Sequence, residues 1–168
     1  EMCIRDRSNK AGSNSTRGIW AGTSGGSNTY TNIIYSVSIQ SLGDSVDFGD
    51  RSAYFAGSAM ASQTRLVMAG GRSTAASPYG TTNIMDFVNF ASLGNAEDFG
   101  DLIAATGGMN GGAASPVRGV FAGGYAPSKT DTISYIQIAS EGDATDFGNI
   151  AAGNQYLTGF SNGHGGLG

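Results

Sequence analysis

The chain has 168 residues, which is enough for one domain, and it combines 28 glycines with a charged fraction of 13%, against roughly 25% in an average domain. Glycine and small polar residues interrupt every apolar run, so helix formers never accumulate and the composition predicts an all-β chain. The net charge of −4 argues against a nucleic-acid partner, and a single cysteine excludes an internal disulfide. No apolar run approaches the roughly 18 residues of a membrane span.

The first fourteen residues precede the regular part of the sequence. Residues 1–7 (EMCIRDR) are charged and non-repetitive, and they resemble the translated adapter sequence that often begins truncated metagenomic reading frames; a disordered terminus is the alternative. Residues 8–16 (SNKAGSNST) look like the end of a preceding repeat. We therefore expect residues 1–14 to lie outside the domain, residues 15–168 to form it, and the chain to begin within a longer protein.

A unit of about fifty residues then occurs three times, which is typical of a propeller or a repeat array. Each unit opens with a short run of β-formers that starts at an arginine and ends in Ala-Gly, and we interpret this run as the inner strand of a sheet. The three arginines are Arg17, Arg65 and Arg118. We place the units at about 15–62, 63–115 and 116–168.

The second part of each unit alternates between apolar and polar residues, and a glycine turn and an Asp-Phe-Gly motif follow. These parts occupy residues 33–50, 84–101 and 132–149. The period of two predicts strands, and partly apolar residues on the other face suit a sheet stacked between two sheets. We expect two sets of positions to be buried: Val37, Val88 and Ile136, and Ile39, Phe90 and Ile138.

One phenylalanine recurs in every Asp-Phe-Gly motif, and we predict that it fills the gap between neighbouring sheets. The three residues are Phe48, Phe99 and Phe147. Residues 53–60, 104–111 and 152–159 supply one more strand each, which brings the number to about four per unit. Residues 17–164 are thus predicted to form three four-stranded antiparallel sheets without helices.

The acidic residues near the phenylalanines are candidates for chemistry. The motif aspartates Asp47, Asp98 and Asp146 invite comparison with the magnesium ligand of protein kinases, but the other kinase motifs are missing. Further carboxylates and amides at short spacing would allow a calcium site. Asp and Asn beside glycine are also good turn formers, so we predict structural roles and no metal ion, with calcium as the alternative.

The arginines and the remaining polar residues do not assemble a catalytic site. We expect each arginine to form a forked pair with a carboxylate of the repeat, with ligand contact as the alternative. The only histidine, His164, lies in a glycine-rich tail, and no Ser-His-Asp or Cys-His pair can be assembled from strand residues. The glycine pairs lack the helix and lysine of a phosphate loop. We expect no enzyme activity and no cofactor.

Length variation between the units concentrates in the loop that follows each arginine strand. Every one of these loops carries one tyrosine among Ser, Gly, Thr and Asn: Tyr30, Tyr79 and Tyr125. This composition is typical of antibody-like binding loops. We predict exposed binding loops, and solvated linkers are the alternative.

The units resemble kelch repeats. Ala69-Gly70-Gly71 and Ala122-Gly123-Gly124 stand where kelch repeats carry a double glycine, and the repeated phenylalanines stand where these repeats usually carry tryptophan. Thr23 replaces the second glycine in the first unit. The resemblance covers about residues 16–164, and it implies four-stranded blades of a β-propeller and usually a binding role.

A second resemblance concerns residues 117–124 (VRGVFAGG) and 132–148 (TISYIQIASEGDATDFG). They are similar to repeats of marine phage and metagenomic proteins that are often labelled tail fibre or structural. This similarity implies a non-enzymatic, virion-associated or extracellular surface protein that contacts a host glycan or protein. A cellular kelch-like module for protein–protein interaction is the alternative, and a carbohydrate-active propeller enzyme is a third.

Three units are fewer than the four to eight blades of most propellers. We therefore expect an open fragment of a larger propeller, whose partners are additional blades of the parent protein or a second copy. Trp20 and Tyr35 at one end, and Tyr135 and Ile138 at the other, are predicted to be exposed. Such apolar ends favour self-association or marginal stability of the isolated chain.

Overall fold

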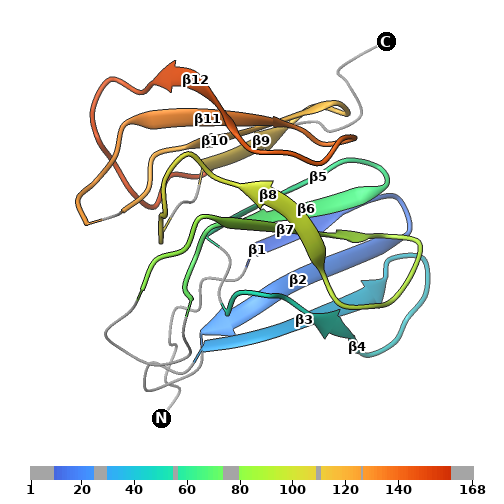
Figure 1. Cartoon of the computed structure of the whole chain (residues 1–168). Helices are drawn as coiled ribbons and strands as arrows, with labels where there is room; N and C mark the ends of the chain where they lie inside the picture. Colours follow the sequence, from blue (N-terminus) through green and yellow to red (C-terminus); the bar gives the residue numbers. More distant parts are fainter. Residues whose placement is uncertain are drawn as a thin grey trace.

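The computed structural model describes residues 10–24, 30–54, 57–73, 80–108, 111–125 and 127–159, and every regular element in these ranges is a β-strand (Figure 1). No helix within them is long and apolar enough to cross a membrane. The first sheet contains β1 (Lys10–Ser13), β2 (Arg17–Ser24), β3 (Tyr30–Ser38) and β4 (Val46–Asp50). The second contains β5 (Ser58–Ala61), β6 (Arg65–Ala69), β7 (Ile84–Asn89) and β8 (Glu97–Asp101). The third contains β9 (Gly111–Ala114), β10 (Arg118–Ala122), β11 (Thr132–Gln137) and β12 (Thr145–Asn149).

Each sheet is an antiparallel meander in which the strands follow chain order. The pairing of the third with the fourth strand shifts register at the same place in every sheet, between Ile34 and Tyr35, Met85 and Asp86, and Ile133 and Ser134. A bulge of this kind bends a strand and increases its twist. The prediction of three four-stranded antiparallel sheets is confirmed for the described residues.

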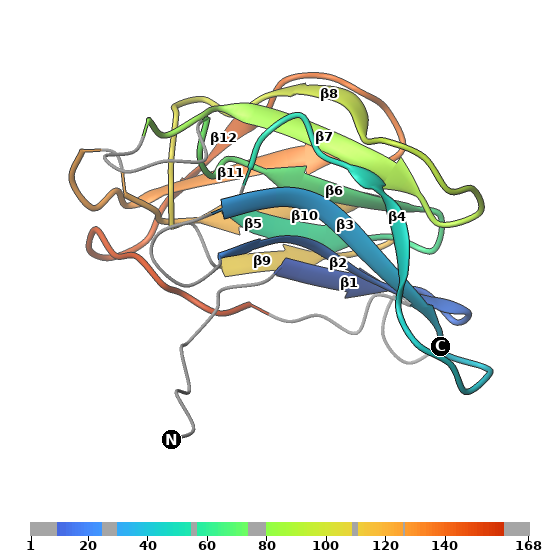
Figure 2. The ribbon, with the colours of Figure 1, turned by 90° about the horizontal axis from the view of Figure 1, so that it is seen from below.

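The first strands of the three sheets, β1, β5 and β9, lie side by side at the centre, and the fourth strands lie outermost (Figure 2). The arginine strand is therefore second from the centre, and its interpretation as the inner strand is wrong. The central strands read KAGS, SAMA and GGAA. A Cβ on Gly112 would lie 2.9 Å from the carbonyl oxygen of Ala59, so small residues allow the backbones to crowd there.

The same arrangement corrects the borders of the units. Residues 10–13, expected outside the domain at the end of a preceding repeat, form β1 and pair with β2. The strands expected near residues 53–60 and 104–111 begin later, at Ser58 and Gly111, and each is the first strand of the next sheet. Residues 152–159 form no strand.

Two apolar clusters fill the two junctions between sheets. The cluster between the first and second sheets includes Ile19, Phe48 and Leu66, and the cluster between the second and third includes Val67 and Phe99. Successive residues of β6 thus face opposite neighbours, and both are buried. A sheet covered on both faces needs this nearly continuous apolar run.

Burial depends on whether a neighbouring sheet exists. Phe48 and Phe99 are 3% and 2% exposed, as predicted, but Phe147 is 53% exposed because no sheet lies beyond the third in the described chain. On the opposite side Ile39 is 54% exposed, again against prediction, and Val37 is only partly buried. The other predicted core residues are buried: Val88, Ile136, Phe90 and Ile138.

Candidate functional site

The meander sorts all connections to two ends of the molecule (Figures 1 and 2). One end, which we call the loop face, carries the connections from second to third strand and from each sheet to the next. Its described segments are 51–54, 70–73, 80–83, 102–108, 123–131 without residue 126, and 150–159. The other end, the turn face, carries the hairpins at 14–16, 62–64 and 115–117 and the turns at 39–45, 90–96 and 138–144.

A pocket of about 110 Å³ opens on the loop face between the second and third sheets. We call it the junction pocket. The described residues of its wall carry aliphatic or hydroxyl side chains and no charge, among them Leu102, Ile103, Thr106, Thr130, Thr132 and Ser134. Such a lining favours an uncharged ligand group that has both apolar and hydroxyl surface.

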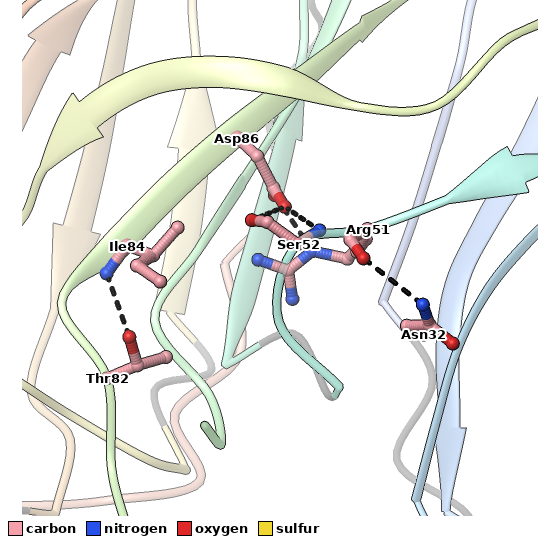
Figure 3. Close-up of polar contacts among 6 residues, drawn as sticks. All are labelled: Asn32, Arg51, Ser52, Thr82, Ile84 and Asp86. Carbon is pink, nitrogen blue, oxygen red and sulfur yellow. Dashed lines mark hydrogen bonds and ion pairs between the residues drawn. The ribbon is translucent and has the colours of Figure 1, made fainter. Parts of the chain in front are cut away.

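The corresponding place between the first and second sheets is filled by a buried ion pair, Arg51 with Asp86 (Figure 3). Arg51 occupies the repeat position of Leu102, and Asp86 occupies that of Ser134. The Arg51 Nε donates to Asp86 Oδ1 over 2.8 Å, and both side chains are fully buried. The long Arg51 side chain and the Asp86 carboxylate thus occupy the space that the smaller Leu102 and Ser134 leave open at the other junction.

The Asp86 carboxylate is well satisfied, whereas the guanidinium is not. Asp86 Oδ2 accepts hydrogen bonds from the Ser52 backbone N–H at 3.1 Å and from Ser52 Oγ at 2.8 Å. Within the described part of the chain, Arg51 Nη1 and Nη2 are buried without a hydrogen-bond partner. The backbone around the pair is held by Asn32, whose Nδ2 donates to the Arg51 carbonyl, and by Thr82, whose Oγ1 accepts from the Ile84 N–H.

Of the two proposed binding tyrosines that the structure describes, Tyr125 lies exposed in a loop. Tyr30 begins β3, is partly buried, and has the Arg72 guanidinium over its ring at 5.0 Å. The expected position of Tyr30 in an exposed loop is therefore wrong, because the strand extends further than the alternating pattern does, and its binding role stays a prediction. Tyr79 lies outside the described residues.

A second exposed tyrosine, Tyr156, was missed by the sequence analysis. Its φ of 60° is uncommon for a residue other than glycine and carries a cost of about 1–3 kcal/mol, which is typical of functional positions. The Tyr156 N–H donates to the Gly108 carbonyl at 3.4 Å, and Tyr125 and Gly107 exchange two backbone hydrogen bonds. Tyr125 and Tyr156 thus flank residues 107–108, directly after Thr106 of the junction pocket.

The charges of the loop face lie outside the pocket lining. Arg51 and Asp86 neutralise one another at the first junction, and Arg72 lies over Tyr30. Lys10 begins β1 at the loop-face end of the centre, where burial lowers the pKa of its ammonium below 10.5. The lining of the junction pocket is therefore neutral, but two charged residues lie beside the site: Lys129 pairs with Tyr125 in an isolated bridge, and Asp131 stands between Thr130 and Thr132 of the lining.

No protein-family model matches the sequence, and no curated protein matches it. Among solved structures the chain is similar to YjhT, a kelch-repeat β-propeller protein, with a TM-score of 0.72 at 10% sequence identity. The match covers 92% of this chain and 56% of YjhT. The chain thus has a β-propeller fold of three four-stranded antiparallel blades that do not close into a ring. It spans about half the length of YjhT, and at this identity the likeness concerns the fold alone.

The repeated arginines link each blade to the following blade through carbonyl groups. Arg17 Nη1 donates to the Phe90 carbonyl of the second blade at 2.6 Å. Arg65 Nη1 donates to the Ala139 carbonyl of the third blade at 3.5 Å, and its Nη2 lies 3.4 Å from Glu141 Oε1. Arg65 thus has a carboxylate partner, whereas Arg17 donates to a carbonyl, and leucine stands at the position of Glu141 in the other two units.

Each of these guanidinium groups also lies over an aromatic ring of its own blade. The distances to the ring centre are 5.6 Å from Arg17 to Phe48, 4.4 Å from Arg65 to Phe87 and 4.7 Å from Arg118 to Tyr135. Cation–π contact thus orients an arginine even where, as for Arg118, no following blade is present in the described chain.

The acidic turns also connect blades. Asn95 Oδ1 accepts from the Asp50 N–H and Asp143 Oδ1 from the Asp101 N–H, each at 3.0 Å. The motif residues Asp47, Asp98 and Asp146 are exposed, and Asp146 Oδ1 accepts from the Gly148 N–H at 3.0 Å. The described residues contain no group of three or more His, Cys, Asp or Glu that could hold a metal ion.

Proposed function

We propose that this chain is a non-enzymatic structural and binding module of a virion-associated surface fibre, of the phage tail-fibre kind, and that its loop face contacts a host glycan. The observation that carries the binding role is the position of exposed Tyr125 and Tyr156 beside the neutral junction pocket. The placement on a virion is supported by the resemblance of residues 117–124 and 132–148 to the repeats of marine phage proteins.

The chemistry of this site suits carbohydrate. Sugars present hydroxyl groups beside apolar C–H surfaces, and tyrosine offers a rigid ring with a polar tip that can match both. The junction pocket, at about 110 Å³, is smaller than the roughly 300–1,000 Å³ of usual small-molecule sites. The pocket accommodates one group of a larger ligand, and the rest of that ligand would lie across the loop face.

A glycan array probed with the full chain tests the proposal, and titration with the glycan it retains locates the site. We expect Tyr125→Ala and Tyr156→Ala each to weaken binding roughly fivefold or more, as central interface residues do. Val117→Ala is the matched control, because Val117 is exposed at the turn face, and its affinity should equal that of the unaltered chain.

Three results would contradict the proposal in different ways. Retained affinity in both tyrosine variants would remove the loop-face site. Capture of a protein partner through the same tyrosines, without any glycan, would favour a kelch-like interaction module. Release of sugar from a bound glycan would refute the non-enzymatic role.

A further inference from the structure

The contact between successive blades includes a backbone connection at the outer edge. Residues 94–96 of the second blade run along β4, where the Gly94 and Ala96 N–H groups donate to the carbonyls of Phe48 and Asp50 at 2.9 and 2.8 Å. Residues 142–144 of the third blade repeat this along β8, with 2.7 and 2.8 Å from Gly142 and Ala144 to Phe99 and Asp101. We call this connection the edge lock. It joins the turn of one blade to the Phe-Gly-Asp of the preceding blade.

The glycine of Asp-Phe-Gly is needed for this close approach. A Cβ on Gly49 would collide with the Gly94 carbonyl, and one on Gly100 would lie 2.6 Å from the Gly142 carbonyl oxygen. Around Gly148, the third member, nothing lies within 4 Å of the same point. Blade 3 therefore presents the receiving half of an edge lock, Phe147–Asn149, without an inserted turn in the described chain.

Blade 1 presents the complementary half. Its turn, residues 42–45, stands at the repeat position of 93–96 and 141–144, its glycine has a similar φ to theirs, and it is exposed. The apolar residues behind this turn form a surface that we call the leading face: Trp20, Tyr35, Val37, Ile39 and Leu42. Trp20 is 38% exposed, whereas Met68 and Phe121 at its position in the other blades are fully buried against the preceding blade.

The opposite surface, on blade 3, is apolar as well. We call it the trailing face, and it consists of Val120, Ile133, Tyr135 and Phe147. The residues at these positions in blades 1 and 2 are all buried against the following blade, and Ser36 stands where the other blades have an aromatic residue. They are Ile19, Ile34, Ser36 and Phe48 in blade 1, and Val67, Met85, Phe87 and Phe99 in blade 2. The leading and trailing faces therefore carry the two halves of the same contact that the chain already makes twice.

One further position shows this complementarity. The hollow inside the turn of blade 1 is lined in part by Leu93, which reaches over from blade 2. The same hollow in blade 3, about 160 Å³ between Tyr135, Glu141 and Thr145, is lined by residues of blade 3 itself. Leu42, the counterpart of Leu93, is fully exposed in blade 1.

We propose that the trailing face of one copy packs on the leading face of a second copy, with residues 42–45 of the second copy forming an edge lock on β12 of the first. The exposed Arg118 then reaches the carbonyls that follow Ser38 of the second copy, as Arg17 and Arg65 reach the blades that follow them. When each copy packs its trailing face on the leading face of the other, the two copies close a twofold-symmetric ring of six blades. The chain matches 56% of YjhT, so two copies together carry about the length of that propeller.

Size-exclusion chromatography with light scattering on the full chain tests this contact. The unaltered chain should be a dimer at micromolar concentration, and Trp20→Asp and Phe147→Asp should each be monomeric, because each places a charge at an apolar contact in both interfaces. An equimolar mixture of the two variants should recover dimers, since one leading and one trailing face remain intact. A dimer of Phe147→Asp alone would indicate that like faces pair, and a monomeric unaltered chain or a monomeric mixture would overturn the proposal.

Leu42→Asp and Leu93→Asp form a matched pair, because both leucines lie at the same turn position and only Leu42 belongs to the leading face. We expect Leu42→Asp to weaken the dimer at least tenfold and Leu93→Asp to leave its dissociation constant unchanged. Trp20 is the only tryptophan, so its fluorescence emission should move to shorter wavelength as the chain is concentrated. Circular dichroism of each variant verifies that the β-structure is retained. Emission that does not change with concentration would contradict the contact.

Discussion

Three phenylalanines with the same local sequence lie in different surroundings. Phe99 meets Phe87 edge-on at 5.9 Å, and Phe147 meets Tyr135 in the same way at 5.9 Å. The contact within the blade is therefore alike, yet Phe99 is buried and Phe147 is half exposed. The difference comes entirely from the next blade, so the contribution of a phenylalanine to stability depends on its neighbour.

Substituting alanine at the two positions measures this contribution. Phe99→Ala should lower the free energy of unfolding by roughly 3–5 kcal/mol, because it removes a buried ring and leaves a cavity. Phe147→Ala should cost less than about 1 kcal/mol when the chain is monomeric. Urea unfolding of dilute protein followed by circular dichroism gives both values. Similar losses in the two variants would contradict this account of blade packing.

At the scale of the element, the two blade junctions use different chemistry at one repeat position. The first junction holds the ion pair Arg51–Asp86, and the second holds Leu102 and Ser134 around a pocket. Removing one partner of a buried pair leaves an uncompensated charge, which is far more costly than replacing both partners. The second junction therefore shows which residues can replace the ion pair at the first junction.

Asp86→Ser should destabilise the chain by roughly 3–5 kcal/mol, because Arg51 then remains charged and buried without its carboxylate. The double variant Arg51→Leu with Asp86→Ser copies the second junction and should recover most of this loss. The measurement is the free energy of unfolding of both variants and of Arg51→Leu alone. A double variant as unstable as Asp86→Ser would show that the ion pair is not the source of the cost.

The sequence predicts the blades well because their strands, glycine turns and phenylalanines recur with one period. It does not predict features that occur in one unit alone. Arg51 and Asp86 are 35 positions apart, and neither is repeated, so nothing in the pattern links them. Tyr156 lies exposed with a φ of 60°, a backbone conformation that tyrosine rarely adopts and that the repeat pattern does not show.

Other differences arise because a sequence pattern does not show what a side chain faces. Alternation separates the two faces of a strand, but it does not reveal which face has a neighbour. Ile138 was therefore expected at the open end and is 1% exposed, because it packs on blade 2. Likewise, the arginines were expected to pair with carboxylates, whereas Arg17 donates to a backbone carbonyl and Arg65 donates to both a carbonyl and Glu141; a carbonyl acceptor leaves no trace in the sequence because every residue possesses one.

At the scale of the whole molecule, the blades differ in the number of their neighbours. Blade 2 is covered on both faces, whereas blades 1 and 3 each have one open face. In repeat architectures stability is roughly the sum of the stabilities of the units and of the contacts between neighbours. The outer blades of a single copy should therefore open more readily than the middle blade.

Hydrogen exchange of the backbone amides resolves this difference strand by strand. In dilute protein, the amides of β6 and β7 should exchange more slowly than those of β2, β3, β10 and β11. Concentrating the unaltered chain should raise the protection of the outer blades towards that of blade 2, because ring closure gives every blade two neighbours. The Phe147→Asp variant, which lacks an intact trailing face, should retain the gradient at every concentration. Equal protection of all three blades in this variant would mean that each blade is stable without a second neighbour, and the open faces would then have no energetic reason to associate.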